Sequence, residues 1–153
     1  MAKSHLCVVV AILASFFHCV VACCPTYYTE FDSKCYRVFG ENKSWNDAAT
    51  TCSYDGADLV SIHSPLENNF VFSYWHSSNG NKGNGFWIGL NDISSEGHFR
   101  WDGGWTFNYA NWRNGEPNNR NDEDCVQVYK DDGRWNDEDC HHEKTFVCKR
   151  DMI

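Results

Sequence analysis

A short polar stretch near the end of the chain, residues 115–125 with the sequence GEPNNRNDEDC, is dense in oxygen-bearing side chains. Glu116 and Asn118 flank a proline, and an acidic run over residues 122–124 leads into a cysteine. Calcium takes six to eight oxygen ligands from carboxylates, amide carbonyls and water, so this composition predicts a calcium site. An EF-hand is disfavoured, because the stretch lacks the glycine at loop position six and has no helix on either side.

Acidic runs taken in isolation are more often solvated surfaces than metal sites. This alternative applies to residues 122–124 and to a second acidic run at residues 137–139. The adjacent His141 and His142 suit a transition metal, but with no other assigned ligand they are more readily explained as surface residues.

The first 22 of the 153 residues have the features of a signal peptide. Lys3 supplies a positive charge, residues 6–21 form an apolar run, and Val20 and Ala22 are small residues at positions −3 and −1 of a cleavage site. We therefore expect a secreted, extracellular protein of residues 23–153, with no later stretch able to cross a bilayer. The formal net charge of −8 argues against nucleic acid or an anionic membrane as a partner.

The chain contains nine cysteines, which fits an oxidising compartment. Two of them leave with the signal peptide, and none of the other spacings is C-x-x-C, which lowers the prior for a zinc or redox motif. Six cysteines make three bridges with fifteen connectivities, and the seventh suggests an intermolecular bond or a reactive thiol. Adjacent Cys23 and Cys24 make one of that pair the extra cysteine.

The local patterns place two helices before a series of short strands. Ser44 caps a helix that ends at Gly56, and Ser64 and Pro65 begin a second helix that dissolves in a Gly/Asn/Ser loop at residues 77–85. This order predicts an α+β fold. The strand candidates are residues 59–62, 86–90, 98–101, 125–129 and 145–149.

Taken together, these motifs resemble the C-type lectin-like domain in its long form, across essentially all of residues 23–153. The opening Cys-Cys-Pro-Thr is similar to that of secreted invertebrate lectins, especially those of echinoderms. The matching motifs are, in chain order, Cys24-Pro25, Cys35-Tyr36, Ser44-Trp45 with Ala48 and Cys52, residues 56–62, residues 87–90, Glu116-Pro117-Asn118, Trp135-Asn136-Asp137, Cys140 and Cys148.

The resemblance implies a double-loop fold with two helices, short antiparallel strands and a long calcium-binding loop region. It implies one carbohydrate-recognition domain over residues 23–153, and an interchain bond at Cys23 that makes a disulfide-linked homo-oligomer. The implied intrachain pairs are Cys24–Cys35, Cys52–Cys148 and Cys125–Cys140.

The resemblance also assigns the calcium ligands, which in the family hold a sugar as well. For this chain they are Glu116, Asn118, Glu123, Asn136 and Asp137. Glu123 is assigned by its distance from Cys125, because the intervening loop is one residue shorter than in vertebrate collectins. An auxiliary calcium site is implied at Asp92, Glu96, Asn119 and Asp124. Asn119 stands where an acid is common, so one negative charge is missing from that site.

The order Glu-Pro-Asn resembles family members that bind mannose, glucose, N-acetylglucosamine or fucose. The alternative is a galactose-binding variant in which an aromatic ring reorients the sugar, with Trp105 or Trp112 as the stacking residue; Trp112 is also explained as a packing residue. The expected function is therefore a calcium-dependent lectin for terminal sugars of glycans, an agglutinin or an innate immune recognition protein for microbial surfaces.

Two further classes of protein share some of these sequence features. An enzyme is disfavoured, because carboxylates bound to calcium stay ionised and are poor proton donors, and no pair of nucleophile and base stands out. An acidic lectin-like domain that binds calcium mineral or a protein partner without sugar is the stronger rival. Asn42, in the sequence Asn-Lys-Ser, is a glycosylation acceptor motif whose Ser44 also serves as the helix cap.

Overall fold

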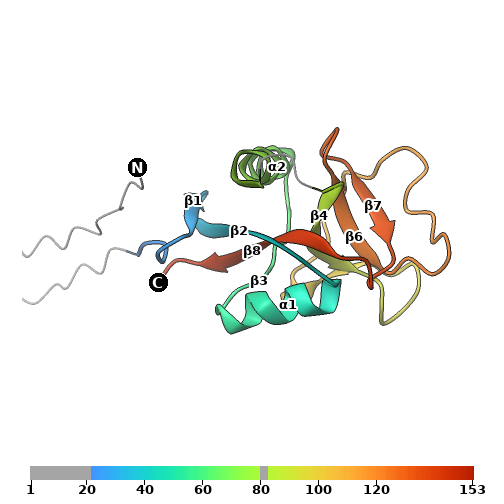
Figure 1. Cartoon of the computed structure of the whole chain (residues 1–153), viewed down its shortest axis with the longest axis horizontal. Helices are drawn as coiled ribbons and strands as arrows, with labels where there is room; N and C mark the ends of the chain where they lie inside the picture. Colours follow the sequence, from blue (N-terminus) through green and yellow to red (C-terminus); the bar gives the residue numbers. More distant parts are fainter. Residues whose placement is uncertain (1–21, 80–82) are drawn as a thin grey trace, which may run out of the picture.

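The computed structural model of the protein describes residues 22–79 and 83–153 (Figure 1). The signal peptide expected at residues 1–22 lies, apart from Ala22, outside the described residues. The elements, in chain order, are β1 (Thr29–Phe31), β2 (Lys34–Lys43), α1 (Trp45–Tyr54), β3 (Asp58–Leu59), α2 (Pro65–Asn79), β4 (Gly85–Asn91), β5 (Arg100–Trp101), the 3₁₀ turn η1 (Asp102–Gly104), β6 (Cys125–Tyr129), β7 (Trp135–Glu138) and β8 (Lys144–Asp151).

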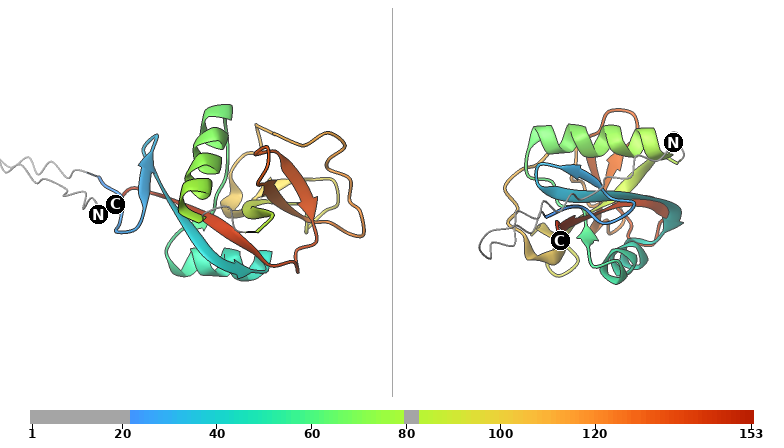
Figure 2. Two further views of the ribbon diagram at one scale, coloured as in Figure 1. Left: turned by 45° about the horizontal axis from the view of Figure 1, so that its top comes forward. Right: turned by 90° about the vertical axis from the view of Figure 1, so that its left-hand side faces the viewer.

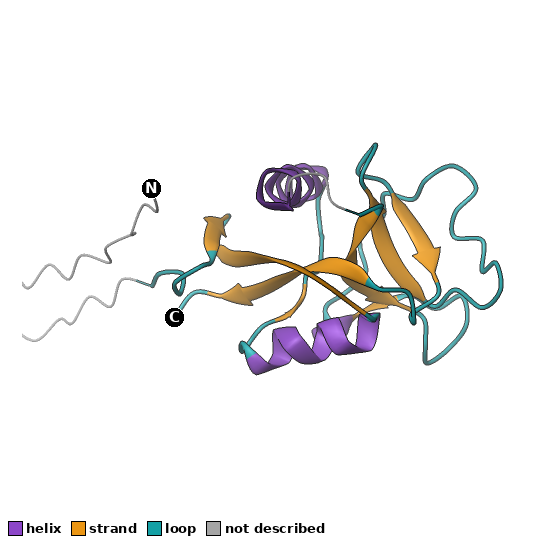
Figure 3. Ribbon diagram, viewed as in Figure 1, coloured by secondary structure: helices purple, strands orange, loops and turns teal. Residues whose placement is uncertain are grey.

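The strands form one sheet in the order β1-β2-β8-β4-β6-β7, with β3 paired to β8 and β5 paired to β4. The β4–β8 pair is parallel and the other pairs are antiparallel. Helices α1 and α2 lie on opposite sides of the β2–β8 ribbon (Figures 1 and 3). The predicted α+β class is confirmed.

Both helices begin where their capping residues predict. The Ser44 hydroxyl accepts a hydrogen bond from the Asp47 amide at the start of α1, and the Ser64 hydroxyl accepts one from the Glu67 amide at the start of α2. α1 ends next to Gly56, whose φ of +67° suits a residue without a side chain.

Three strands have no counterpart in the sequence-based prediction: β1, β2 and β7. β2 is held by non-local pairing, since its residues Lys34–Phe39 pair with β8 more than a hundred positions away. β7 reads as a polar loop because it contains Asn136 and Asp137, yet both side chains are buried. When the buried face of a strand carries the polar residues of a functional site, the strand lacks the apolar alternation by which it would be predicted from sequence.

The core contains five buried tryptophans among the described residues, and the indole N–H groups of four of them have hydrogen-bond acceptors on distant parts of the chain, Trp101 being the exception. Trp45 donates to the Ile88 carbonyl, Trp75 to the Thr145 hydroxyl, Trp87 to the Lys43 carbonyl and Trp135 to the Asn68 side chain. A buried indole needs such a partner, so these bonds select one arrangement of helices against the sheet.

Three disulfides join the described parts of the chain. Cys24–Cys35 ties the N-terminal segment to β2, Cys52–Cys148 ties α1 to β8, and Cys125–Cys140 closes the β6–β7 hairpin. These are the pairs that the family resemblance implies. Cys23 is joined to Ile153 by two backbone hydrogen bonds of 3.0 and 3.1 Å, and the interchain bond expected at this cysteine stays a prediction.

A long loop over residues 105–124 leaves the sheet after η1 and returns at β6, at the end of the molecule opposite the C-terminus (Figure 3). Backbone hydrogen bonds of 2.9 Å from Arg113 to Trp135 and from Trp135 to Asn111 fasten this loop to β7. The loop is thereby held beside the acidic residues of the hairpin. No helix within residues 22–79 and 83–153 combines the length and apolar character needed to cross a membrane.

Candidate metal centre

Asp137 is the residue around which the first predicted site is organised. It lies on β7 with only 1% of its surface exposed. Its carboxylate accepts the Asn118 backbone amide at 2.9 and 3.0 Å and the Asn119 backbone amide at 2.6 Å. These hydrogen bonds therefore hold residues 118–119 of the long loop against β7.

Glu116 and Asn118 lie in the part of the long loop that is hydrogen-bonded to the Asp137 carboxylate. They are separated by Pro117, whose peptide bond with Glu116 is cis, and the Asn118 side-chain amide donates to the Glu116 carboxylate. Burial raises the pKa of Glu116, and the neighbouring Asp137 charge raises it further, against the lowering effect of the Asn118 hydrogen bond. A cation between the Glu116 and Asp137 carboxylates stabilises the charged form of both.

Of the other two predicted ligands, Glu123 precedes β6 and Asn136 lies next to Asp137 on β7. The Glu123 carboxylate accepts the Arg120 amide at 3.1 Å, and the Asn136 amide donates to the Asp137 carbonyl. Burial raises the pKa of Glu123, and so do the charges of Asp137, Glu138 and Glu116. The charge of Glu123 thus adds to that of the Glu116–Asp137 pair, which fits a divalent cation.

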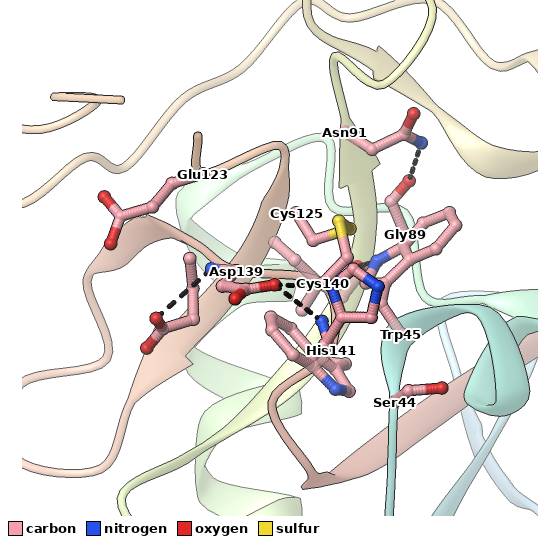
Figure 4. The surroundings of a disulfide bond; sticks show 12 residues. Ser44, Trp45, Gly89, Asn91, Glu123, Cys125, Asp139, Cys140 and His141 are labelled. Atoms are coloured by element: carbon pink, nitrogen blue, oxygen red, sulfur yellow. Dashed lines mark hydrogen bonds and ion pairs between the residues drawn. A yellow bond between two sulfur atoms is a disulfide. The ribbon is translucent and has the colours of Figure 1, made fainter. Parts of the chain in front are cut away.

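Figure 4 shows the surroundings of the Cys125–Cys140 disulfide, with Glu123, Asp139 and His141 near it. The Glu123 side chain points away from the disulfide, while Asp139 and His141 meet beside it through hydrogen bonds of 2.9 Å. Asp139 is therefore engaged with His141 and is separate from the Glu116 site. His141 and His142 are exposed and pair with Asp139 and Glu138, in agreement with their interpretation as surface residues.

The second predicted site brings its three acids together. One carboxylate oxygen from each of Asp92, Glu96 and Asp124 lies within 4.8 Å of the others, and the Asp92 amide donates to the Asp124 carbonyl at 3.0 Å. Asn119, the fourth expected member, instead contacts the first site: its side-chain oxygen accepts the Glu123 amide at 2.8 Å.

Asp92 carries the most direct indication of a cation. One of its oxygens accepts the Gly97 amide at 2.8 Å, and the other is buried and has no hydrogen-bond partner within the described part of the chain. Burial raises the pKa of Asp92, and the charges of Glu96 and Asp124 raise it further. A buried carboxylate oxygen without a donor is costly unless a metal ion coordinates it, so the three acids fit calcium.

Replacing Asp92 with asparagine tests this second site. We expect calcium to raise the thermal unfolding midpoint of the wild type, because a ligand at one hundred times its Kd stabilises a protein by about 2.7 kcal/mol. In Asp92→Asn the midpoint in EDTA should stay the same or rise, since repulsion among the acids is relieved, and the increment from calcium should shrink. Asp131→Asn, on an exposed loop, serves as the control. An undiminished calcium increment in Asp92→Asn would exclude these acids as ligands.

The two tryptophans considered as stacking residues have other contacts. Trp112 packs edge-on against Phe99 and Trp135, with ring centroids 5.0 and 5.9 Å apart, so it anchors the loop. Trp105 contacts Lys34 and His63, on elements remote from Glu116 in the sheet. Arg113, which the sequence did not single out, lies beside the first site instead. It is linked to Glu116 by a 3.0 Å backbone hydrogen bond, and its guanidinium lies 4.6 Å from the centre of the Tyr129 ring.

With this fold, the molecule has the architecture of a lectin-like domain. Residues 41–150 match the family model of the Lectin C-type domain, and the chain belongs to this family. Members of the family are non-enzymatic binding proteins, so the chain is a binding protein rather than an enzyme.

Among its relatives, the chain is 38% identical over 130 residues to Lectin BRA-3 of Megabalanus rosa, covering 82% of this chain and 76% of that protein. It is 36% identical to the human C-type mannose receptor 2 over 83% of this chain, but it spans only 8% of the length of that receptor.

The solved structure of the C-type lectin CEL-I from Cucumaria echinata is similar, with a TM-score of 0.78 and 36% identity over 82% of this chain and 96% of that one. A calcium-independent type II antifreeze protein has the same TM-score of 0.78 at 24% identity, covering 89% of this chain and all of that one. That likeness concerns the fold alone, so the fold does not by itself establish calcium or sugar binding.

Proposed function

We propose that this protein is a secreted lectin that holds calcium at Glu116, Asn118, Glu123, Asn136 and Asp137 and binds a terminal sugar of a glycan through the same residues. The observation that carries the proposal is the contact between Glu116 and Asn118 above the buried Asp137 carboxylate. Carboxylate and amide oxygens at one point are the ligand set that calcium prefers.

The sugar chemistry follows from the same side chains. Two neighbouring hydroxyls of a hexose enter the coordination sphere of the ion and hydrogen-bond its ligands. A carboxylate accepts from a hydroxyl and an amide NH2 donates to one, so Glu116 and Asn118 offer one acceptor and one donor, and Glu123 and Asn136 repeat the pairing. The order Glu-Pro-Asn favours the mannose class, which is also the class in the name of the similar human receptor.

The same function includes a mature domain, a second calcium ion and glycan partners. Residues 23–153 form the mature carbohydrate-recognition domain after removal of residues 1–22. Asp92, Glu96 and Asp124 hold a second calcium ion that stiffens the loop, since Asp124 directly precedes the β6 strand. The partners are glycans, with microbial surfaces and agglutination as the setting. Several linked copies would raise avidity without any new contact.

One alternative has a specific observation in its favour. The likeness to a calcium-independent protein shows that this fold persists without the ion, so a domain that binds a protein or mineral surface without sugar is the second candidate. The two candidates differ in the ligand chemistry of the Glu116 site and in sensitivity to free sugar.

Binding to immobilised sugars tests the proposal. We expect the purified protein to be retained on mannose-agarose in calcium and released by EDTA, and to be retained less on galactose-agarose. Retention on galactose alone would keep the lectin function and contradict the mannose preference. Absence of retention on both resins and on a broad glycan array in calcium would contradict the proposed function and favour the sugar-independent candidate.

A further inference from the structure

A cavity of about 390 Å³ lies at the end of the molecule that carries the C-terminus, where β2 begins, β8 ends and α1 passes into β3, and the first residue of the long loop, Trp105, also lines it. The right-hand view of Figure 2 faces this end. Its volume falls within the range of small-molecule sites in proteins. The residues of this distal cavity that matter for the argument are Lys34, Asp58, Ser61, Trp105, Lys149 and Arg150.

Trp105 supplies an exposed aromatic ring in a fixed position. The side chain is 45% exposed, although tryptophan is normally buried. Its edge rests against the His63 ring, at 6.2 Å between centroids. His63 is itself held by hydrogen bonds of 3.0 Å to Ser61 and 3.1 Å to Asn108. The contact with the hydrogen-bonded His63 ring therefore holds the indole in one orientation.

Two polar side chains with spare hydrogen-bonding capacity, those of Arg150 and Asp58, line the same cavity as this ring. The Arg150 guanidinium donates through Nη1 to the Asp55 carbonyl at 2.9 Å, while its Nε is buried without a partner among the described residues. The Asp58 carboxylate lines the same space and offers acceptors. The lining of the cavity thus combines hydrogen-bond donors and acceptors with an aromatic ring.

The charges of this cavity nearly cancel. Lys34 forms an ion pair with Asp151, and Lys149 forms one with Glu67 at 2.6 Å. Arg150 and Asp58 remain, with opposite signs. A strongly anionic ligand would meet the Asp58 carboxylate and a cationic one would meet Arg150, so the balance favours a neutral molecule with many hydroxyls.

We propose that the distal cavity is a second, calcium-independent saccharide site, in which the C–H face of a neutral pyranose packs on Trp105 and its hydroxyls hydrogen-bond Asp58, Arg150 and Ser61. Lys34, whose ammonium lies 5.2 Å from the centre of the indole, moves aside on binding. Its ion pair with the exposed Asp151 is a surface pair and costs little to break. The site shares no residue with the Glu116 centre and does not depend on the function proposed there.

Saturation-transfer NMR with millimolar methyl α-mannoside and methyl β-galactoside, in EDTA, tests this site. EDTA removes calcium, so binding at the Glu116 centre does not contribute. We expect transfer to the ring protons of at least one glycoside with the wild-type protein. In Trp105→Ala the signal should fall by about fivefold or more, because the indole supplies the main apolar area for the sugar face. Trp105→Phe should restore part of it.

Phe107→Ala is the matched control, since Phe107 is an exposed aromatic residue two positions along the same loop and does not line the cavity. It should leave the transfer unchanged. The proposal is overturned if neither glycoside shows transfer with the wild type in EDTA, or if Trp105→Ala retains the full signal. Loss of calcium-dependent retention on mannose with persistent transfer in EDTA would contradict the Glu116 site and leave this one standing.

Discussion

Replacing Asp137 with asparagine should abolish calcium-dependent retention on mannose. The variant loses the negative charge of a proposed calcium ligand, and the charged acceptor of two backbone N–H groups becomes a neutral amide oxygen. A hydrogen bond to a charged group contributes about 1.5–3 kcal/mol. Because each 1.4 kcal/mol is tenfold, we expect the affinity for immobilised mannose to fall by about 100-fold or more.

Asp139→Asn provides the matched control. It makes the same chemical change two residues away, on a side chain that is 44% exposed and bonded to His141. Its retention should equal that of the wild type. Both variants are compared by thermal unfolding in EDTA, so that loss of binding is separated from loss of folding. A folded Asp137→Asn protein that elutes like the wild type in calcium would refute the assignment of the sugar site.

Replacing Glu67 with glutamine should destabilise the whole domain. Glu67 lies at the start of α2, is 8% exposed, and forms a 2.6 Å ion pair with Lys149 of β8. Its carboxylate also accepts the Tyr36 hydroxyl and the His63 amide, each at 2.7 Å. Breaking a buried pair by removing one charge costs about 3–5 kcal/mol, since the other charge stays buried and uncompensated.

Guanidinium unfolding measures this loss. Glu143→Gln, at an exposed position, should change stability by less than about 0.5 kcal/mol. Adding Lys149→Met to Glu67→Gln should cost less than the sum of the single changes, because the unpaired ammonium is then removed. Equal stability of Glu67→Gln and wild type at pH 7 would contradict the role given to this pair.

The same residue makes the difference between wild type and variant depend on pH. Burial by itself raises the pKa of Glu67, but the hydrogen bonds from Lys149 and Tyr36 and the Lys149 charge outweigh it, so the pKa lies below its ordinary value of 4.5. Between the ordinary value of 4.5 and the lower pKa of the folded state, the unfolded chain binds the proton and the folded chain does not. Wild-type stability therefore falls as the pH drops through this range. The advantage over Glu67→Gln should therefore be full above pH 4.5 and shrink below it.

The residues of the candidate site could be named from the sequence because oxygen-bearing side chains and their local order are visible there, and their role as calcium ligands stays a prediction. Glu116, Asn118 and Asp137 meet in the structure as the family resemblance implies, and Asp92, Glu96 and Asp124 converge as expected. Asn119 departs from the prediction. Its backbone amide and side-chain oxygen are used by Asp137 and Glu123, because the turn at residues 119–123 folds back on itself, and no local pattern reports that.

The sequence likewise does not give the contacts of Trp105 and Trp112. Both are tryptophans in one loop, and the sequence offered both as residues beside the sugar. Packing separates them: Trp112 is held against Trp135 of β7, whereas Trp105 crosses to His63 and Lys34 near the end of β8. Which face of the molecule a loop side chain reaches depends on the path of the backbone, and that path is set by contacts with other elements.

By itself, the sequence determined the helix starts at Ser44 and Ser64, the α+β class and the kinds of calcium ligand, because capping, periodicity and ligand chemistry act over a few residues. Only the tertiary structure decided that Asp137 holds the backbone of the long loop, that Glu67 pairs with Lys149 across 82 positions, and that Trp105 lines a cavity with residues of β2 and β8. These features depend on strand register and on burial of polar groups between distant segments, for which local patterns carry no signal.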